Sequence, residues 1–225
     1  MKSYFISGTD TGIGKTKVTQ LLLRSYAERN ISAIAIKPIA CGSQKNINYP
    51  HHTNEDAEIF HISNSISLPY KTINPILLDA PISPHLAAQR QGITLSINSI
   101  QNAIKPALNA GAEVLLCEGA GGLLVPLNEK ETILDLCQAL HFPLIMVVGI
   151  RLGCINHALL SAEVLQQRQV ICAGWYANCL DESLLQFRDV IKTIEDSYAT
   201  ILNTPLLGII PYNPPLSFLP SLPSK

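Results

Sequence analysis

The sequence predicts an α/β fold with a doubly wound, mostly parallel sheet in a single domain. Short apolar runs without clear alternation are typical of strands buried on both faces, as in a parallel sheet covered by helices. Stretches with helical periodicity lie between these runs, and a repeated strand–helix order is typical of doubly wound sheets. A chain of 225 residues with 47% hydrophobic side chains can bury one large core, so one domain, residues 1–225, is expected.

The expected elements follow the apolar runs along the chain. Strands are expected at residues 3–8, 31–37, 113–119, 143–150, 171–178 and 205–212. Helices are expected at residues 15–30, 95–111, 131–141 and 155–168. Residues 214–225 are rich in proline, which cannot continue a helix, so a tail is predicted where a closing helix would otherwise be expected.

The segment GTDTGIGKT, residues 8–16, is a variant of the phosphate-binding loop. The usual pattern is GxxxxGK[ST], in which backbone N–H groups and a lysine bind phosphates and the hydroxyl binds Mg²⁺. Gly14, Lys15 and Thr16 match this pattern, but the first glycine is Gly8, so the loop is one residue longer. Because it joins a strand to a helix N-terminus, we predict a nucleoside triphosphate site of the P-loop nucleotide triphosphatase type.

Two acidic residues are candidates to bind a metal ion beside these phosphates. Mg²⁺ usually takes a hydroxyl of the loop, one or two carboxylates and phosphate oxygens. Thr16 supplies the hydroxyl, and Glu118 lies at the end of the predicted strand 113–119. Asp56, within NEDAEIF, is the second candidate, although a lone acid in a loop is usually only solvated.

A second lysine, Lys37, is predicted to face the phosphate site. It ends the strand 31–37, and Pro38 prevents the strand from continuing its hydrogen bonding, so the backbone turns at the carboxyl edge of the sheet. Ligands of such sheets bind beyond this edge. Lys15 and Lys37 at one point indicate an anionic co-substrate that attacks the γ-phosphorus.

Composition argues against several other classes of protein. The net charge of −1 and the scattered basic residues give no footprint for nucleic acid or an anionic membrane surface. The six cysteines form no CxxC pair and the histidines no HExxH spacing, which favours reduced thiols and argues against zinc. Apolar runs are too short for a signal peptide or a membrane span, so a cytoplasmic protein acting on small molecules is expected.

Several segments together resemble the dethiobiotin synthetases, the ATP-dependent cyclo-ligases of biotin biosynthesis. They are, in order, GTDTGIGKT, KPIACG, SPHLAA, EGAGGLLVP, VVGIRLGCINHALLS, GWYAN and PLLGIIPY. The resemblance runs from residue 3 to about residue 213 and is most specific in GIRLGCINH, EGAGG and the segment around Lys37.

This resemblance implies a reaction and its cofactors. 7,8-Diaminononanoate and CO₂ form an N7 carbamate, whose oxygen takes the γ-phosphoryl group of Mg²⁺-bound ATP. N8 then attacks the carbamic–phosphoric anhydride, closes the ureido ring and expels phosphate. Only a neutral amine reacts, and an alkylamine with a pKa of about 10.4 is neutral in about one part in a thousand at pH 7. Nearby lysines disfavour the charged amine and stabilise the carbamate, so they would assist both steps.

The resemblance also implies roles for individual residues. Lys37 and Lys15 would be catalytic, and Mg²⁺ would be bound by Thr16, Asp56 and Glu118. The nucleotide would be bound by Gly12, Ile13, Gly14, Lys15, Thr16, Lys17, Asp56, Glu118, Gly119, Ala120, Gly121, Asn178, Cys179, Pro211, Tyr212 and Asn213. The diamine would lie by Thr11, Lys37 and Cys41, and its carboxylate would reach Cys154, Ile155 and Asn156 across a homodimer interface, with Tyr198 as a further candidate. A helix starting there would attract a carboxylate with its free N–H groups.

Three positions of the active-site loops bear on this interpretation. Asp10 would lie toward the metal and the diamine, where it would either orient water on Mg²⁺ or attract an ammonium group. Cys41 stands where the family commonly has a small hydroxyl residue, and a thiol is a weaker donor, so weaker substrate binding is expected. Gly12 replaces a glutamate found in some members, which removes a contact to the ammonium group.

Two other classes of protein share parts of this pattern. Switch ATPases of the partitioning kind carry KGGxGKT, with a lysine where this chain has Asp10, and no basic amphipathic C-terminal helix for a membrane is apparent here. Relatives that amidate a carboxylate with glutamine need an additional domain, for which 225 residues leave no room.

Overall fold

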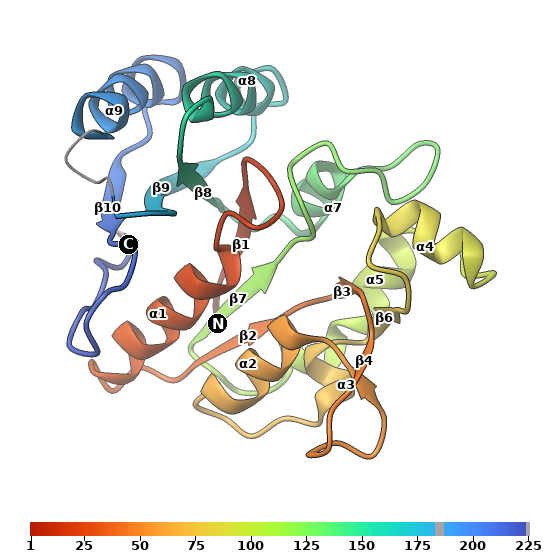
Figure 1. Cartoon of the computed structure of the whole chain (residues 1–225). Helices are drawn as coiled ribbons and strands as arrows, with labels where there is room; N and C mark the ends of the chain where they lie inside the picture. The colour runs from red at the N-terminus through yellow and green to blue at the C-terminus, as the bar shows by residue number, and fades with distance from the viewer. Residues whose placement is uncertain (183–186, 224–225) are drawn as a thin grey trace.

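The computed structural model describes residues 1–182 and 187–223, and its centre is a parallel sheet (Figure 1). In this described part the sheet has six strands in the order β10-β9-β8-β1-β7-β2. The strands are β1 (Lys2–Gly8), β2 (Ala33–Ile36), β7 (Val114–Glu118), β8 (Leu144–Ile150), β9 (Cys172–Cys179) and β10 (Leu206–Ile210). The predicted strands are therefore confirmed, with small shifts at their ends.

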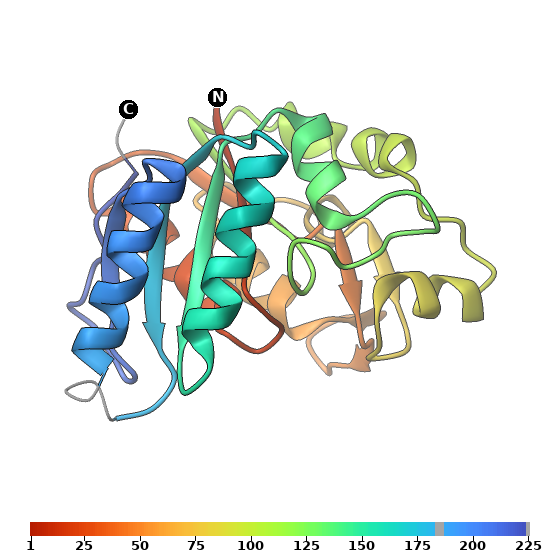
Figure 2. The same cartoon turned by 90° about the horizontal axis from the view of Figure 1, so that it is seen from above.

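Helices cover both faces of this sheet, as a doubly wound fold requires. On one face lie α1 (Lys15–Ala27) and α2 (Glu55–Ser63); on the other lie α7 (Ile133–Leu140), α8 (Cys154–Gln167) and α9 (Arg188–Leu202). Figure 2 shows α8 and α9 side by side along the sheet. Among the described residues, every helix is too short or too polar to span a membrane.

Successive residues of the strands point to opposite faces and so contribute to two separate cores. Tyr4 and Ile6 of β1 belong to the core under α1 and α2, whereas Phe5 between them belongs to the core under α7, α8 and α9. All three are at most 1% exposed. Burial on both faces explains why these runs are apolar without alternation.

The order of the strands reverses beside β1. The chain passes from β1 to β2 at one edge, and from β7 it crosses to β8 on the other side of β1. Ligands of open α/β sheets bind at such a reversal, beyond the carboxyl ends of the strands. The phosphate loop, residues 8–16, follows β1 at this point.

The segment between β2 and β7 contains elements that the sequence did not indicate. The strands β3 (Ile39–Cys41) and β6 (Ile76–Leu78) form a parallel pair, and β4 (Gln44–Lys45) pairs with β5 (His52–Thr53). The helices α2, α3 (Tyr70–Ile73) and α4 (Pro84–Arg90) also lie in this segment. Outside it, α9 was not predicted either. Most of these elements span too few residues for a periodic pattern to identify them.

The predicted helix at residues 95–111 is divided in the structure. It forms α5 (Ile97–Ala103) and α6 (Lys105–Leu108), with Pro106 in the first turn of α6. Proline has no N–H and its ring clashes with the carbonyl four residues earlier, so one continuous helix could not form.

The tail lies along α1. Its described part, residues 214–223, contains no helix; the last two residues of the predicted tail, 224 and 225, lie outside the described residues. Ser25 donates a hydrogen bond to the Pro220 carbonyl at 2.9 Å, and Tyr176 donates one to the Ser221 carbonyl. These contacts hold the tail against the α1 side of the sheet.

Candidate nucleotide and metal site

Two glycines of the phosphate loop adopt backbone conformations that other residues rarely adopt. Gly12 has φ of 71° and Gly14 has φ of 85°, both in the left-handed region. Gly14 directly precedes α1, so the unpaired N–H groups of the first turn are directed toward the loop. The loop therefore has the backbone arrangement that binds phosphates.

Lys15 of this loop is almost completely buried. Its Nζ donates a hydrogen bond to the Asp10 carbonyl at 2.7 Å, which folds the side chain back over the loop. Burial, together with the nearby charge of Lys37, lowers the pKa of Lys15 to about 8. An anion that entered the loop would stabilise the charged form of this side chain.

Three oxygen-bearing side chains meet beside Lys15. Thr16 Oγ1 lies 2.8 Å from Asp56 Oδ1 and 2.9 Å from Glu118 Oε1. Glu118 is fully buried, and its other oxygen accepts a hydrogen bond from Thr19 at 3.0 Å. The residues predicted to bind Mg²⁺, Thr16, Asp56 and Glu118, are thus brought to one point from α1, α2 and β7.

Lys37 completes this cluster. Its Nζ lies 2.6 Å from Glu118 Oε1 and 2.9 Å from Asp56 Oδ2. Burial alone would lower the pKa of Lys37, but the two carboxylates outweigh it and hold the pKa above its usual value. Despite its burial, the pKa of Asp56 is lowered, because Lys37 and the Thr16 hydroxyl stabilise its carboxylate.

This cluster fits Mg²⁺. Its donors are a hydroxyl and two carboxylates, which are the oxygen ligands that Mg²⁺ prefers. Within residues 1–182 and 187–223 no group of three or more His, Cys, Asp or Glu side chains could hold an ion by itself. An ion bound by Thr16, Asp56 and Glu118 would therefore complete its coordination with water or with oxygens of bound phosphates.

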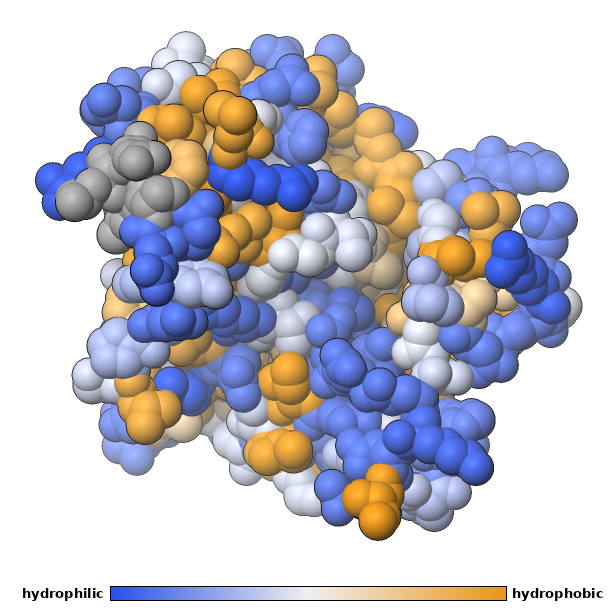
Figure 3. Space-filling model, in the orientation of Figure 1, coloured by the Kyte–Doolittle hydropathy of each residue, from blue (hydrophilic) through white to orange (hydrophobic). Residues whose placement is uncertain are grey.

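A cavity of about 620 Å³ opens in front of the cluster, and Figure 3 shows a hollow near the centre of this face. Its lining includes the predicted residues Thr11, Gly12, Gly14, Lys15, Thr16, Lys37, Cys41, Asp56, Glu118, Ala120 and Gly121. Sequence reasoning missed Asn54, Ile82 and Val125, which also line it. Asn54 and Val125 lie within NEDAEIF and EGAGGLLVP, and SPHLAA begins beside Ile82, but no pattern assigned these three residues to a site.

Another group of predicted residues lies where β9 and β10 end. Asn178 Nδ2 donates a hydrogen bond to the Ile13 carbonyl at 2.8 Å, whereas its buried Oδ1 has no hydrogen-bond partner among the described residues. Lys17 donates hydrogen bonds to the carbonyls of Pro211 and Tyr212, which connects the start of α1 to the loop after β10. An acceptor of the Asn178 side chain therefore remains available beside the phosphate loop.

The predicted carboxylate site at Cys154, Ile155 and Asn156 lies at the start of α8, and none of the three lines the cavity. Cys154 is 2% exposed, while Asn156 is exposed. Gly153, with φ of 90°, precedes the helix; the Cys154 N–H donates to the Arg151 carbonyl at 3.1 Å, and the N–H groups of Ile155 and Asn156 have no acceptor within the helix.

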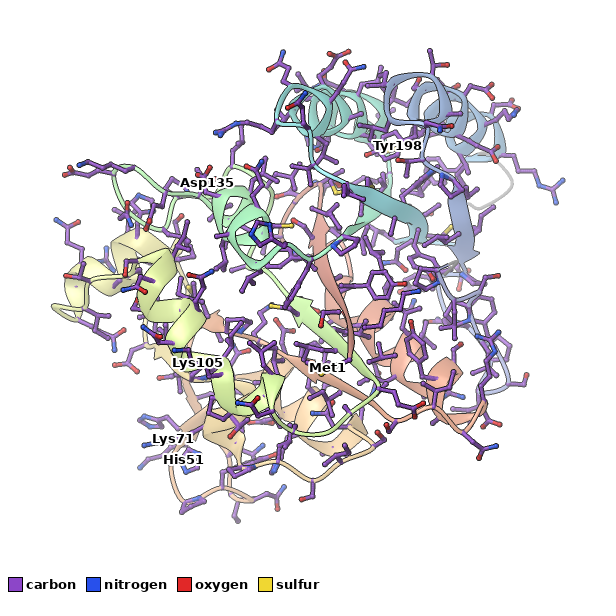
Figure 4. All side chains as sticks on the ribbon, turned by 180° about the vertical axis from the view of Figure 1, so that it is seen from behind. Met1, His51, Lys71, Lys105, Asp135 and Tyr198 are labelled. Carbon is purple, nitrogen blue, oxygen red and sulfur yellow. The ribbon has the colours of Figure 1, made fainter. Side chains whose placement is uncertain are left out.

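The prediction that Tyr198 binds the substrate carboxylate is wrong for this structure. Tyr198 is fully buried on the inner side of α9, its ring lies 5.1 Å from that of Trp175, and its hydroxyl donates to the Ala158 carbonyl at 3.2 Å. Figure 4 shows it in the helical layer of α8 and α9. Tyr198 lies on the buried face of α9, a helix that was not predicted from the sequence.

Asp10 is held by a residue that sequence reasoning missed. Its Oδ2 lies 2.8 Å from Nη2 of Arg151, and its Oδ1 accepts a hydrogen bond from the Thr11 amide at 2.7 Å. The carboxylate thus connects the phosphate loop to the loop after β8. Arg151 lies within GIRLGCINH, but no pattern in the sequence pairs it with Asp10.

The sheet, the phosphate loop and the Thr16–Asp56–Glu118 cluster define a P-loop nucleotide-binding protein. A family model described as "AAA domain" matches residues 2–219. The chain is 42% identical over 212 residues to the ATP-dependent dethiobiotin synthetase BioD of Nitrosospira multiformis, covering 94% of this chain and 89% of that protein. It is 41% identical over 217 residues to the protein of the same name from Legionella pneumophila, covering 96% and 97%. The chain belongs to the dethiobiotin synthetase family.

Solved structures of other proteins share the fold. The MinC:MinD cell division protein complex of Aquifex aeolicus matches with a TM-score of 0.56 and 16% identity, covering 95% of this chain and 82% of that one. A ParA family ATPase from Chlorobium tepidum matches with a TM-score of 0.53 and 10% identity, covering 94% and 85%. At these identities the likeness shows the fold alone.

Proposed function

We propose that this protein catalyses the ATP- and Mg²⁺-dependent closure of 7,8-diaminononanoate and CO₂ to dethiobiotin, with ADP and phosphate as the other products. Residues 1–225 would act as one P-loop ligase domain in the cytoplasm. The observation that carries this proposal is Lys37, buried against Asp56 and Glu118 beside the phosphate loop, in a chain of the dethiobiotin synthetase family.

The chemistry requires an anion to be phosphorylated and an amine to be kept neutral. One amine of the substrate adds to CO₂ and loses a proton, which gives a carbamate. A carbamate oxygen then bonds to the γ-phosphorus as ADP leaves, and the second amine attacks the carbamate carbon and expels phosphate. Mg²⁺, when bound, neutralises charge on the β- and γ-phosphates. The reacting groups would lie in the cavity in front of the cluster.

Lys15 and Lys37 would act in both steps. Their positive charges disfavour an ammonium group nearby and so raise the fraction of neutral amine. The same charges stabilise the carbamate and the phosphoryl group that it receives. Lys37 stays charged throughout the pH range of enzymes, because Glu118 and Asp56 raise its pKa. Its assignment as the residue that contacts the carbamate rests on its place in the cavity.

The free Oδ1 of Asn178 supports a site for adenine. The exocyclic amino group of adenine is a donor, and a buried acceptor without a partner is costly unless a ligand supplies one. Cys179 beside it, and Pro211, Tyr212 and Asn213 after β10, would enclose the base. Gly119, Ala120 and Gly121 would border the phosphates.

We also propose that the protein is a homodimer in which the carboxylate of the substrate lies at the start of α8 of the partner subunit. The free N–H groups of Ile155 and Asn156 would bind it beside Cys154, whose own N–H donates to the Arg151 carbonyl. Nearby, Leu152 is 97% exposed and Leu160 is 58% exposed, and exposed apolar side chains of this kind are typical of a covered surface. Sedimentation at micromolar concentration would report a dimer if this proposal holds and a monomer if it fails.

Phosphate release tests the proposed reaction. Release from ATP with Mg²⁺ is expected only when both 7,8-diaminononanoate and bicarbonate are present. Equal release without the diamine would contradict the ligase and favour a switch ATPase.

A further inference from the structure

Lys37 and Asp56 are joined by a second route, separate from their direct ion pair. Asn74 Nδ2 donates a hydrogen bond to the Lys37 carbonyl at 2.7 Å, and Asn74 Oδ1 lies 3.4 Å from the Tyr70 hydroxyl. The same hydroxyl accepts a hydrogen bond from the Asn54 amide at 2.8 Å. Tyr70 is 6% and Asn74 is 2% exposed, so water does not replace these contacts.

Asn54 connects the Tyr70 hydroxyl to Asp56. Its Oδ1 accepts a hydrogen bond from the Asp56 amide at 3.2 Å and caps α2. Its Nδ2 lies 3.3 Å from the Cys41 carbonyl and 3.1 Å from the Gly42 carbonyl. Asn54 therefore fixes the start of α2 and the end of β3, where Asp56 and Cys41 line the cavity.

The backbone of Lys37 depends on the same short segment. Its amide donates to the Ile73 carbonyl at 2.8 Å, so both backbone groups of Lys37 bind the end of α3. Burial raises the pKa of Tyr70 to about 12, which keeps its hydroxyl able to donate and accept at once. With α3 only four residues long, side-chain contacts rather than a long helix must hold it.

We infer that Tyr70, Asn74 and Asn54 are positioning residues, which fix Asp56 and Lys37 in the geometry that the proposed reaction needs. This inference rests on the proposed function, because the positions of Asp56 and Lys37 affect the rate only if they take part in that reaction. The Tyr70 hydroxyl is the central group of this hydrogen-bonded route, because it contacts both Asn54 and Asn74. Displacements of about 1 Å can cost a large part of the rate when reacting groups are held in place by the protein.

The test compares two variants that each lose one tyrosine hydroxyl. Tyr70→Phe removes the hydroxyl that contacts both Asn54 and Asn74. Tyr49→Phe is the matched control, because the Tyr49 ring lies 5.4 Å from that of Tyr70 but its hydroxyl pairs with His61 Nδ1 at 2.8 Å. Steady-state kinetics, titration calorimetry with ADP and Mg²⁺, and thermal unfolding are measured for both variants and the wild type.

For Tyr70→Phe we expect kcat to fall about tenfold and the affinity for ADP with Mg²⁺ to fall about fivefold, because the hydroxyl that contacts both Asn54 and Asn74 is lost. The KM for the diamine should change less than kcat, because Tyr70 itself does not line the cavity. Tyr49→Phe should leave kcat and the affinity for ADP with Mg²⁺ as in the wild type.

Asn74→Asp is a second variant for the same test. This variant keeps an oxygen that accepts from the Tyr70 hydroxyl, but it replaces the Nδ2 donor by an oxygen that repels the Lys37 carbonyl. The same fall in kcat is therefore expected. The inference is overturned if Tyr70→Phe and Asn74→Asp lower only the unfolding temperature, or if Tyr70→Phe behaves like Tyr49→Phe. If the wild type makes no dethiobiotin, the proposed function fails, while binding of ADP with Mg²⁺ still tests the link to Asp56.

Discussion

Lys37 and Glu118 form a buried ion pair at the carboxyl edge of the sheet, with Nζ 2.6 Å from Oε1. Glu118 is fully buried and Lys37 is 5% exposed. Removing one partner of a buried pair leaves the other charge without compensation. A bound metal cation could compensate the charge of Glu118 in place of Lys37. The pair therefore links the stability of the protein to the metal site.

The first prediction concerns Lys37→Gln. Without Mg²⁺ the free energy of unfolding should fall by about 3 kcal/mol, because Asp56 and Glu118 then lose the cation with which both form ion pairs. Mg²⁺ should restore part of this loss, and it should stabilise the variant more than the wild type. Denaturant unfolding with and without Mg²⁺ measures both. An equal effect of Mg²⁺ on the two proteins would contradict a metal site at these carboxylates.

The second prediction follows from the pKa of Lys15, which burial lowers to about 8. Bound phosphates favour the charged form, so nucleotide binding should take up protons between about pH 7 and 9. The affinity for ATP should therefore fall as the pH rises through this window. Calorimetry in buffers of different ionisation enthalpy measures the uptake. Lys15→Met should lose it, and unchanged uptake in that variant would assign the proton to another group.

The same shift has a consequence for stability. The folded state disfavours the charge of Lys15, and this cost is fully present below about pH 8. Between about pH 8 and pH 10.5 the unfolded chain binds more protons at this position than the folded one, so the contribution of Lys15 to stability rises with pH. The difference in unfolding free energy between the wild type and Lys15→Met should change in that direction across the window.

The third prediction tests the contact between Arg151 and Asp10. Both side chains are almost half exposed, so Arg151→Ala should change the free energy of unfolding by less than about 1 kcal/mol. The KM for ATP should nevertheless rise, because the phosphate loop loses its connection to the loop after β8. Arg168→Ala, which removes a surface pair with Asp135, is the control and should leave this KM unchanged. Equal KM values for all three proteins would show that Asp10 needs no partner.

The fourth prediction concerns Cys41, which lines the cavity. Burial raises the pKa of its thiol to about 11, so it is neutral and a weak donor. Cys41→Ser should lower the KM for the diamine by about threefold to tenfold, as one added hydrogen bond predicts. Cys41→Ala serves as the reference without a donor. If serine and alanine give the same KM, residue 41 makes no hydrogen bond to the substrate.

The residues that could be predicted are those that follow long buried strands. Lys37 and Glu118 end apolar runs, and Thr16 ends a recognisable loop, so their meeting follows from the order of strands and helices. Asp56 lies on α2, which no pattern identified, and only the resemblance to the dethiobiotin synthetases indicated it.

The residues that were missed depend on contacts between irregular segments. Arg151 pairs with Asp10 over a sequence separation of 141 residues, and the Tyr70 hydroxyl meets Asn54 through a four-residue helix. Neither contact has a period or a spacing in the sequence. Tyr198 was assigned wrongly for a different reason: α9 was not predicted, although Ile191, Ile194 and Tyr198 have the spacing of one buried helix face.

The most direct test of the central claim is the mass of the product formed from ¹³C-bicarbonate, 7,8-diaminononanoate, ATP and Mg²⁺. The proposed function predicts dethiobiotin that carries the label in its ureido carbonyl, formed together with ADP, and a loss of this product in Lys37→Gln. Formation of ADP without labelled dethiobiotin would contradict it.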